Sequence, residues 1–236
     1  NVSFRYPHAS EDELSNISFK IEKGQTLAII GATGSGKTTL ISLIPRFYDA
    51  TDGEVLVDGV NVKDFKFDTL YDKLGYVTQK AVLFAGSIRE NVFFGESAAP
   101  ETDEELKNAI ELSQAEEFVD KLPDGAEHMI SQMGRNVSGG QKQRLSIARA
   151  LSRKPEILVF DDSFSALDYK TDAKLREGLN EKLKDTTKII VAQRISTIRH
   201  ADKIIVLDRG EAVGMGTHEE LMKNCDVYKE IALSQL

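Results

Sequence analysis

A glycine-rich segment at residues 31–38 follows an apolar run at residues 27–30 and precedes a second apolar run at residues 39–44. Its residues are Gly31, Ala32, Thr33, Gly34, Ser35, Gly36, Lys37 and Thr38. Two glycines, a lysine and a threonine at this spacing, between a predicted strand and a predicted helix, form the pattern of a phosphate-binding loop. The segment therefore predicts an α/β fold that binds a nucleoside triphosphate.

Each residue type in this loop has a chemical role. Glycines let backbone N–H groups turn toward phosphate oxygens. Lys37 would place a positive charge at the β- and γ-phosphates, and the Thr38 hydroxyl would ligate Mg²⁺. The alternative is an ordinary glycine-rich turn, against which the strand–loop–helix context argues.

Composition excludes several classes of protein. The 236 residues carry a formal net charge of −8, whereas a nucleic-acid-binding surface needs a basic stripe. Cys225 is the single cysteine, so no internal disulfide can form. No apolar run approaches the roughly 20 residues that span a bilayer. The chain begins at Asn1, and we expect a fragment of a longer polypeptide, with removal of an initiator Met as the alternative.

The hydrophobic pattern predicts strands, then helices, then alternating strands and helices. Alternating or buried strands are expected at residues 2–6, 14–21, 27–30, 53–57, 60–62 and 73–77, with a type I′ turn at Asp58-Gly59. Helices are expected at residues 103–115 and 141–153, within a mostly helical stretch from residue 87 to 153. The last third predicts strands at 157–160 and 189–192, a helix at 170–184 and a hairpin at 204–213. This order indicates an α/β core interrupted by a helical insertion.

Two further segments carry chemistry. The apolar strand at residues 157–160 ends in Asp161, the Walker B arrangement, in which a carboxylate holds Mg²⁺ through water. Ser138-Gly139-Gly140-Gln141 stands at the start of the predicted helix at 141–153. A serine there is an ordinary N-cap, but exposed N–H groups at a helix start can also bind an anion.

With these motifs in order, the chain resembles the nucleotide-binding domains of ATP-binding cassette (ABC) transporters over essentially its whole length. Residues 136–144 look like the signature motif, with Val137 where Leu is usual. Residues 76–79 look like the Q-loop, and residues 165–168 match the D-loop. Tyr6 fits the aromatic residue that stacks on adenine, the alternative being a core tyrosine at a strand end.

The resemblance implies a P-loop NTPase (RecA-like) core with an N-terminal antiparallel β subdomain and an inserted α-helical subdomain. Residues 1–85 and 154–236 would form the core and β subdomain, and residues 86–153 the helical signature subdomain. The implied cofactors are ATP and Mg²⁺, with Thr38, Gln79 and Asp161 at the metal. The implied nucleotide-binding residues are Tyr6, Gly31, Ala32, Thr33, Gly34, Ser35, Gly36, Lys37, Thr38, Thr39, Gln79, Ser138, Gly139, Gly140, Gln141 and Asp161.

The segment at residues 83–92 is similar to that of exporter cassettes, which follow a transmembrane domain in one polypeptide. The resemblance therefore implies a transmembrane partner, a place at the cytoplasmic face of the cell membrane, and a head-to-tail dimer with a second cassette. In exporters this stretch lies near the groove that receives a coupling helix of the membrane domain. No nucleic-acid partner is expected.

Two positions depart from the family pattern. Asp162 stands where a glutamate usually positions the attacking water, and Gln193 stands where a histidine usually contacts the γ-phosphate. The catalytic set would thus be Asp162, Gln193 and Lys37. A carboxylate misplaced by about 1 Å can cost 10²-fold in rate, and an amide cannot be protonated. Together these changes resemble the degenerate half of a heterodimeric exporter, with slow hydrolysis at its own site.

Two other functions stay open at the level of sequence. One is a non-hydrolysing regulatory module that uses ATP as a structural clamp, which turnover of a reconstituted pair would distinguish. The other is a soluble cassette ATPase that acts on nucleic acid or ribosomes. The acidic net charge and the exporter-like segment argue against the second. We expect the basic residues of the helix at 141–153 to form a solvated face or to support the signature motif.

Overall fold

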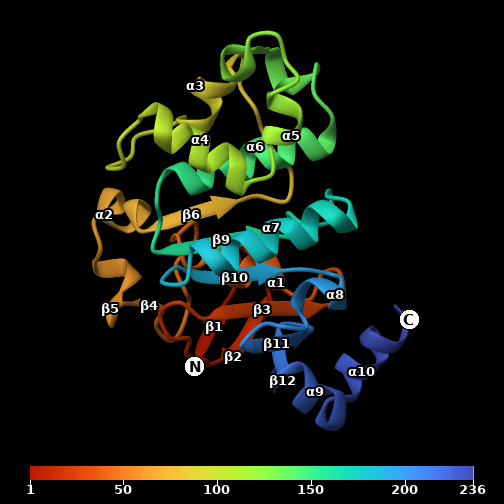
Figure 1. Cartoon of the computed structure of the whole chain (residues 1–236). Coiled ribbons are helices and arrows are strands. Elements are labelled where there is room, and N and C mark those ends of the chain that lie inside the picture. The colour runs from red at the N-terminus through yellow and green to blue at the C-terminus, as the bar shows by residue number, and fades with distance from the viewer. Residues whose placement is uncertain (236) are drawn as a thin grey trace. The chain divides into compact units, whose positions relative to one another are not determined.

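The computed structural model describes residues 1–235, and these form two compact units (Figure 1). The first unit contains Asn1–Tyr71 and the chain from Thr187 onward, and the second contains Asp72–Thr186. The subdomains that the family resemblance implies have other boundaries: residues 1–85 with 154–236, and residues 86–153. That division stays a prediction.

Parallel strands form the centre of the first unit. Its strands are β3 (Thr26–Gly31), β10 (Thr187–Val191), β11 (Lys203–Asp208) and β12 (Glu211–Gly216), in the order β12-β11-β3-β10. Strand β3 pairs in parallel with β10 and with β11, and β12 is antiparallel to β11. Strands β3, β10 and β11 are buried along most of their length, as expected where both faces of a parallel sheet are covered.

Short antiparallel pairs precede and follow the loop in the first unit. Strand β1 (Val2–Phe4) pairs with β2 (Leu14–Ile17), and β4 (Leu56–Val57) pairs with β5 (Val60–Asn61). Asp58 and Gly59 both have positive φ, 52° and 77°, which is the conformation of the predicted type I′ turn. The N-terminal antiparallel structure is therefore confirmed, although β2 is shorter than the predicted strand at residues 14–21.

Five helices of the first unit are short. They are α1 (Lys37–Ser42), α2 (Phe67–Asp72, which reaches the second unit by one residue), α8 (Ile195–Ile198), α9 (His218–Asn224) and α10 (Asp226–Leu233); a 3₁₀ turn, η1, covers Val62–Asp64. Thr217 caps α9 in a capping box with Glu220. Tyr228 of α10 is fully buried, and its hydroxyl lies 2.8 Å from His218 Nδ1.

The second unit joins a strand pair to a group of helices. Strands β6 (Leu74–Val77) and β9 (Ile157–Asp161) are parallel. The helices are α3 (Ile88–Val92), α4 (Asp103–Leu112), α5 (Glu116–Val119), α6 (Gly139–Ser152) and α7 (Tyr169–Lys182), with 3₁₀ turns η2 (Gly125–Glu127) and η3 (Gln132–Gly134). Figure 1 shows α3 to α6 grouped together, so the helical insertion is confirmed. The antiparallel pair β7 (Gly86–Ser87) and β8 (Met129–Ile130) was not predicted, because two-residue strands leave no periodicity.

Caps fix where the long helices begin. Helix α6 starts at Gly139, two residues before the predicted start, because Ser138 is its N-cap and forms a capping box with Gln141. Asp168 caps α7 and accepts hydrogen bonds from the N–H groups of Lys170 and Thr171. Across residues 1–235, no helix has the length and apolar character that crossing a bilayer requires.

Candidate nucleotide site

The glycine-rich loop of the first unit holds its own lysine. Lys37 Nζ donates hydrogen bonds to the carbonyl oxygens of Gly31 (2.8 Å) and Ala32 (2.7 Å) and lies 3.4 Å from Ser35 Oγ. Ser35 is buried, whereas Ala32, Thr33, Gly34 and Thr38 are exposed. The ammonium group is therefore fixed at the loop, and the exposed residues form its rim.

Two glycines in this loop are required by space or by backbone conformation. A Cβ at Gly31 would lie 2.1 Å from the carbonyl oxygen of Leu207 on β11. Gly36 has φ +94°, and its Cβ would lie 2.7 Å from Leu14 Cδ2. A side chain at either position would clash with its neighbours in the first unit, so the observed path of the loop backbone depends on glycine at both.

Tyr6 lies beside the loop helix but within an aromatic group. Its hydroxyl is 2.9 Å from Thr39 Oγ1, and its ring makes edge contacts with Phe4 and Tyr48 at centroid distances of 4.8 and 5.2 Å. The ring is half-buried. The position suits both interpretations made from the sequence, an adenine-stacking residue and a tyrosine that packs at a strand end.

Gln193 lies at the same edge of the sheet as the loop. It is exposed and follows β10 by two residues. Val191 pairs with Ile29 of β3, and the Ala192 N–H donates to the Ile29 carbonyl at 3.3 Å. Ligands of parallel α/β sheets bind at the carboxyl ends of strands, and this is the edge at which both Gln193 and the loop at residues 31–38 lie.

Three predicted site residues meet in the second unit. Asp161 ends β9, Asp162 follows it, and Gln79 follows the neighbouring strand β6 by two residues. Gln79 Nε2 donates a hydrogen bond to Asp162 Oδ2 at 3.1 Å. Both aspartates are buried, and Asp162 has a positive φ of 46°, a conformation that aspartate tolerates better than most residues.

The charge of Asp161 affects the pKa of Tyr76 on the neighbouring strand β6. Burial, and then the negative charge of Asp161, raise the pKa of the Tyr76 phenol above its ordinary value. Tyr76 is therefore neutral, so it adds no negative charge to this edge of β6 and β9.

The signature residues lie at the exposed start of α6. The Ser138 N–H donates to Gln141 Oε1 at 2.8 Å, and the Gln141 N–H donates to Ser138 Oγ at 3.3 Å. A Cβ on Gly139 would meet no atom within 4 Å. The described part of the chain therefore gives no steric reason for glycine at position 139.

Two polar side chains, one buried and one exposed, support the second unit in ways that the motifs did not predict. Gln143 of α6 is buried and donates to the carbonyl of Thr78 at 3.2 Å, beside Gln79. Asp168 of the D-loop caps α7, and hydrogen bonds from the Thr171 N–H and hydroxyl lower its pKa. Gln143 lies within residues 136–144, which look like the signature motif, but nothing in that motif indicates its bond to Thr78.

An exposed aromatic pair at the exporter-like segment packs against a partly buried arginine of α6. Phe84 and Phe94 stack at 4.1 Å, and the Arg149 guanidinium lies over both rings at 5.6 and 5.4 Å. Arg149 donates to the carbonyls of Asn91 (2.7 Å) and Val82 (2.9 Å). Burial lowers the Arg149 pKa. With these contacts to backbone and to both rings, Arg149 supports the structure of the segment in addition to the partial exposure expected of a solvated face.

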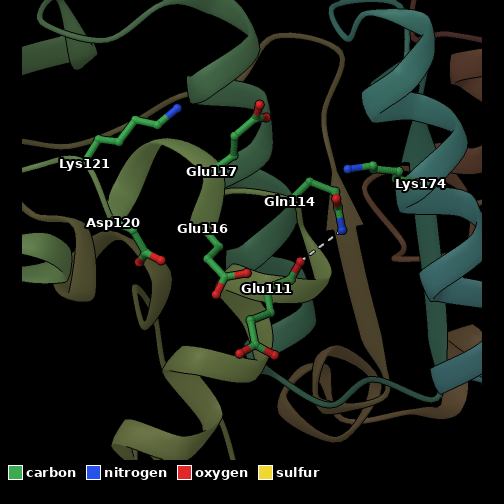
Figure 2. A pocket seen from close by; sticks show the side chains of 7 residues that line it. All are labelled: Glu111, Gln114, Glu116, Glu117, Asp120, Lys121 and Lys174. Carbon is green, nitrogen blue, oxygen red and sulfur yellow. Dashed lines mark hydrogen bonds between the residues drawn. The ribbon is translucent and has the colours of Figure 1, made fainter.

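An open depression of about 440 Å³ lies elsewhere in the second unit. Figure 2 shows carboxylates of the α4–α5 region between Lys121 and Lys174 of α7. Its lining residues are Glu111, Gln114, Glu116, Glu117, Asp120, Lys121 and Lys174. None is a predicted site residue, and four carboxylates oppose binding of a triphosphate.

Each unit contains residues of types that suit Mg²⁺ or a triphosphate. Among residues 1–235, no group of three or more His, Cys, Asp or Glu side chains could hold a metal alone. Mg²⁺ prefers a few protein oxygens completed by water and substrate phosphates. The first unit offers the Thr38 hydroxyl, and the second unit offers the Gln79 amide oxygen and the Asp161 carboxylate. The loop of the first unit suits a triphosphate, since its carbonyls hold the positively charged Lys37 ammonium group.

A comparison with known protein families identifies the family of this chain. The model of the family described as "ABC transporter" matches residues 14–165, which include the loop, Gln79, the signature residues and both aspartates. The chain belongs to the ABC transporter family. It therefore has the ATPase domain of this family, and the P-loop NTPase fold with its parallel sheet and small antiparallel pairs is confirmed.

The relatives of this ABC transporter domain are longer proteins. One from Staphylococcus aureus, named a multidrug export ATP-binding/permease protein, is 44% identical over 231 residues, which are 98% of this chain and 40% of the relative. A protein of the same name from Bacillus subtilis is 42% identical over the same length. The chain thus spans about two fifths of these curated relatives. A solved ATP-bound bacterial Atm1-family ABC exporter is 35% identical, with a TM-score of 0.93, and the match covers 100% of this chain and 41% of the exporter.

Proposed function

We propose that this chain is the ATP-binding domain of an ABC exporter, that it binds Mg-ATP at residues 31–38, and that its own site hydrolyses ATP slowly. Family membership supports binding, and so does the fixed position of Lys37 at the loop carbonyls. Bound Mg²⁺ would withdraw charge from the β- and γ-phosphates. Thr38, Gln79 and Asp161 are its proposed protein ligands.

The main support for the proposal of slow hydrolysis is the hydrogen bond that Gln79 donates to Asp162. An aspartate is one methylene shorter than glutamate, and its carboxylate therefore reaches about 1.3 Å less far. The bond to Gln79 directs Oδ2 toward that amide, so one oxygen is already engaged. When the base that orients the attacking water is misplaced by about 1 Å, the reaction can slow by roughly 10²-fold.

Gln193 adds to this effect at the other proposed catalytic position. Its amide can donate a hydrogen bond to a phosphate oxygen but cannot carry a proton or a positive charge. Neither change removes the hydrogen bonds of Lys37 to the Gly31 and Ala32 carbonyls. We therefore expect retained affinity for ATP with slow turnover.

A head-to-tail partner cassette would complete both sites. The space around Gly139 supports this arrangement: a Cβ there would meet no atom of the described residues within 4 Å, which suits the close approach of a ligand or of another chain. Ser138, Gly139 and Gly140 would then serve the partner's site. The substitutions at Asp162 and Gln193 favour a heterodimer, in which the partner carries the competent catalytic set.

The aromatic pair Phe84–Phe94 is the proposed contact with a transmembrane domain, in the same full-length polypeptide as in the relatives named above. Phe84 and Phe94 are 42% and 49% exposed, and large exposed apolar patches mark interaction sites. Asn91 and Arg149 hold this segment rigidly through hydrogen bonds to its backbone. Such a domain would work at the cytoplasmic face of the membrane and export substrate when ATP closes the cassettes.

The direct test is to identify the nucleotide that the chain retains. We expect the chain, incubated with Mg-ATP and then freed of excess nucleotide, to hold mostly ATP over many minutes. Retention of mostly ADP and release of phosphate at rates of about 1 s⁻¹ or more, the lower end for enzymes, would contradict slow hydrolysis. Failure to retain either nucleotide would contradict binding.

A further inference from the structure

Gln235 bonds the backbone on both sides of Gln193. Its Nε2 donates a hydrogen bond to the carbonyl oxygen of Gln193 at 2.7 Å. Its Oε1 accepts a hydrogen bond from the N–H of Ile195 at 2.8 Å. One side-chain amide, 40 residues further along the chain, thus holds the segment in which Gln193 lies.

The local backbone explains why an amide fits there. Arg194 has an extended conformation, φ −94° and ψ 125°, so the carbonyl of the residue before it and the N–H of the residue after it point to the same side. A carboxamide offers one donor and one acceptor in a plane. It can therefore pair with both groups as a neighbouring strand would.

Gln235 also serves as the missing cap of α8. Helix α8 begins at Ile195, and its N-cap residue Arg194 makes no side-chain capping bond. The first N–H groups of a helix have no partner within it. Gln235 supplies that partner for Ile195 from outside the helix, so the segment between β10 and α8 is fixed at both ends of Arg194.

The position of Gln235 is set by the end of α10. Its own N–H donates to the Ala232 carbonyl at 3.3 Å, and α10 is anchored by the buried Tyr228 and its contact with His218 of α9. A displacement of α10 would therefore move Gln235 and strain or break its hydrogen bonds to the segment that contains Gln193.

We propose that Gln235 is a positioning residue that holds the backbone around Gln193 for contact with the γ-phosphate of bound nucleotide. This inference rests on the proposed function, since it takes Gln193 as the γ-phosphate contact. The residue acts through Gln193 and makes no contact with nucleotide itself. Its effect is thus specific to nucleotides that carry a γ-phosphate.

The first test needs no nucleotide. In the full chain, Gln235→Ala is expected to speed amide hydrogen exchange at Ile195 by about three- to tenfold, the effect of one lost hydrogen bond. Gln235→Glu keeps the acceptor for Ile195 but faces the Gln193 carbonyl with a carboxylate, so it should fall between. Glu230→Ala, an exposed site on the same helix, is the matched control and should leave exchange at Ile195 unchanged.

The second test compares affinities for Mg-ATP and Mg-ADP. Gln235→Ala is expected to lower the ratio of ATP to ADP affinity by about three- to tenfold while the affinity for ADP stays the same. In a Gln193→Ala background the same change should have no further effect. A merely structural role would lower both affinities together.

The possible outcomes distinguish failure of the role proposed for Gln235 from failure of the γ-phosphate contact proposed for Gln193. Unchanged exchange at Ile195, an unchanged affinity ratio in Gln235→Ala, or an equal loss for ATP and ADP each overturns the role of Gln235. Wild-type chain that binds neither nucleotide, or that shows the same ratio after Gln193→Ala, overturns the proposed γ-phosphate contact and the inference with it.

Discussion

Gln79 and Asp162, which follow neighbouring parallel strands, are joined by a hydrogen bond of 3.1 Å between Nε2 and Oδ2. Asp162 is buried and takes a positive φ, so its carboxylate is held by both backbone and partner. In an ABC transporter domain this is the position proposed to orient the attacking water. The short side chain and its bond to Gln79 are the basis of the slow hydrolysis that we propose.

Lys37 should control nucleotide affinity. Replacing it with Ala removes the charge that the loop carbonyls hold in place, and hydrogen bonds to a charged group contribute about 1.5–3 kcal/mol. We expect at least about tenfold weaker binding of Mg-ATP by calorimetric titration. Lys184→Ala, at an exposed residue outside the motifs, is the control. Equal affinities of the two variants would contradict the assignment of the loop.

Gly36 and Gly139 should respond differently to alanine. Gly36→Ala places a side chain at φ +94° against Leu14, and a strained residue of this kind costs about 1–3 kcal/mol. Gly139→Ala enters open space at the start of α6, where alanine is at least as favourable as glycine. Chemical denaturation should show a loss of stability in the first variant and none in the second. If the second also unfolds easily, Gly139 has a structural role within the chain.

Gly139→Ala also tests the partner cassette. Because the fold should tolerate the extra methyl group, any loss of ATP-driven association or of ATPase activity in a reconstituted pair would come from the interface. We expect that loss to exceed tenfold while nucleotide binding to this chain alone is unchanged. Full activity of the pair would contradict the proposed place of the signature residues.

Arg149 should be needed for the aromatic surface. Arg149→Lys keeps a charge but cannot bond the Asn91 and Val82 carbonyls together while stacking on both rings. We expect a loss of about 1–3 kcal/mol from carbonyls left unpaired, measured by denaturation. Phe84→Ala, at a half-exposed ring, should cost less stability but weaken transport in the full-length protein. Normal transport by that variant would contradict the docking surface.

Tyr228 gives the first unit a defined dependence on alkaline pH. Burial and then the nearby Glu219 raise its pKa from 10.0 to about 12. The folded state therefore keeps a proton that the unfolded state loses, so this stabilisation is complete below pH 10 and is lost as pH rises toward 12. The free energy of unfolding should fall there by at most about 1.4 kcal/mol per pH unit. The unfolding free energy of Tyr228→Phe, measured by denaturation across this pH range, should not show this fall. If the variant shows the same pH dependence as the wild-type chain, the role of Tyr228 is contradicted.

The sequence allowed the main features of the fold and the loop to be predicted because each has a strong local signal. The buried strand before the loop, the Asp58-Gly59 turn and the Ser138 cap are set by neighbouring residues, and the structure contains all three. Gln143, Arg149 and Gln235 could not be found in this way. Their partners lie far along the chain, and an isolated glutamine or arginine in a polar segment predicts nothing about which backbone group it will bond.

The central claim is tested most directly by restoring the two altered catalytic positions. We expect the chain with Asp162→Glu and Gln193→His, paired with a partner cassette, to hydrolyse Mg-ATP bound at its own site in a single-turnover assay at least about 10²-fold faster than the wild-type chain in the same pair. Asp185→Glu, the same change at an exposed residue outside the motifs, should leave the wild-type rate unaltered. A wild-type chain that hydrolyses bound ATP as fast as the doubly substituted one would contradict the account.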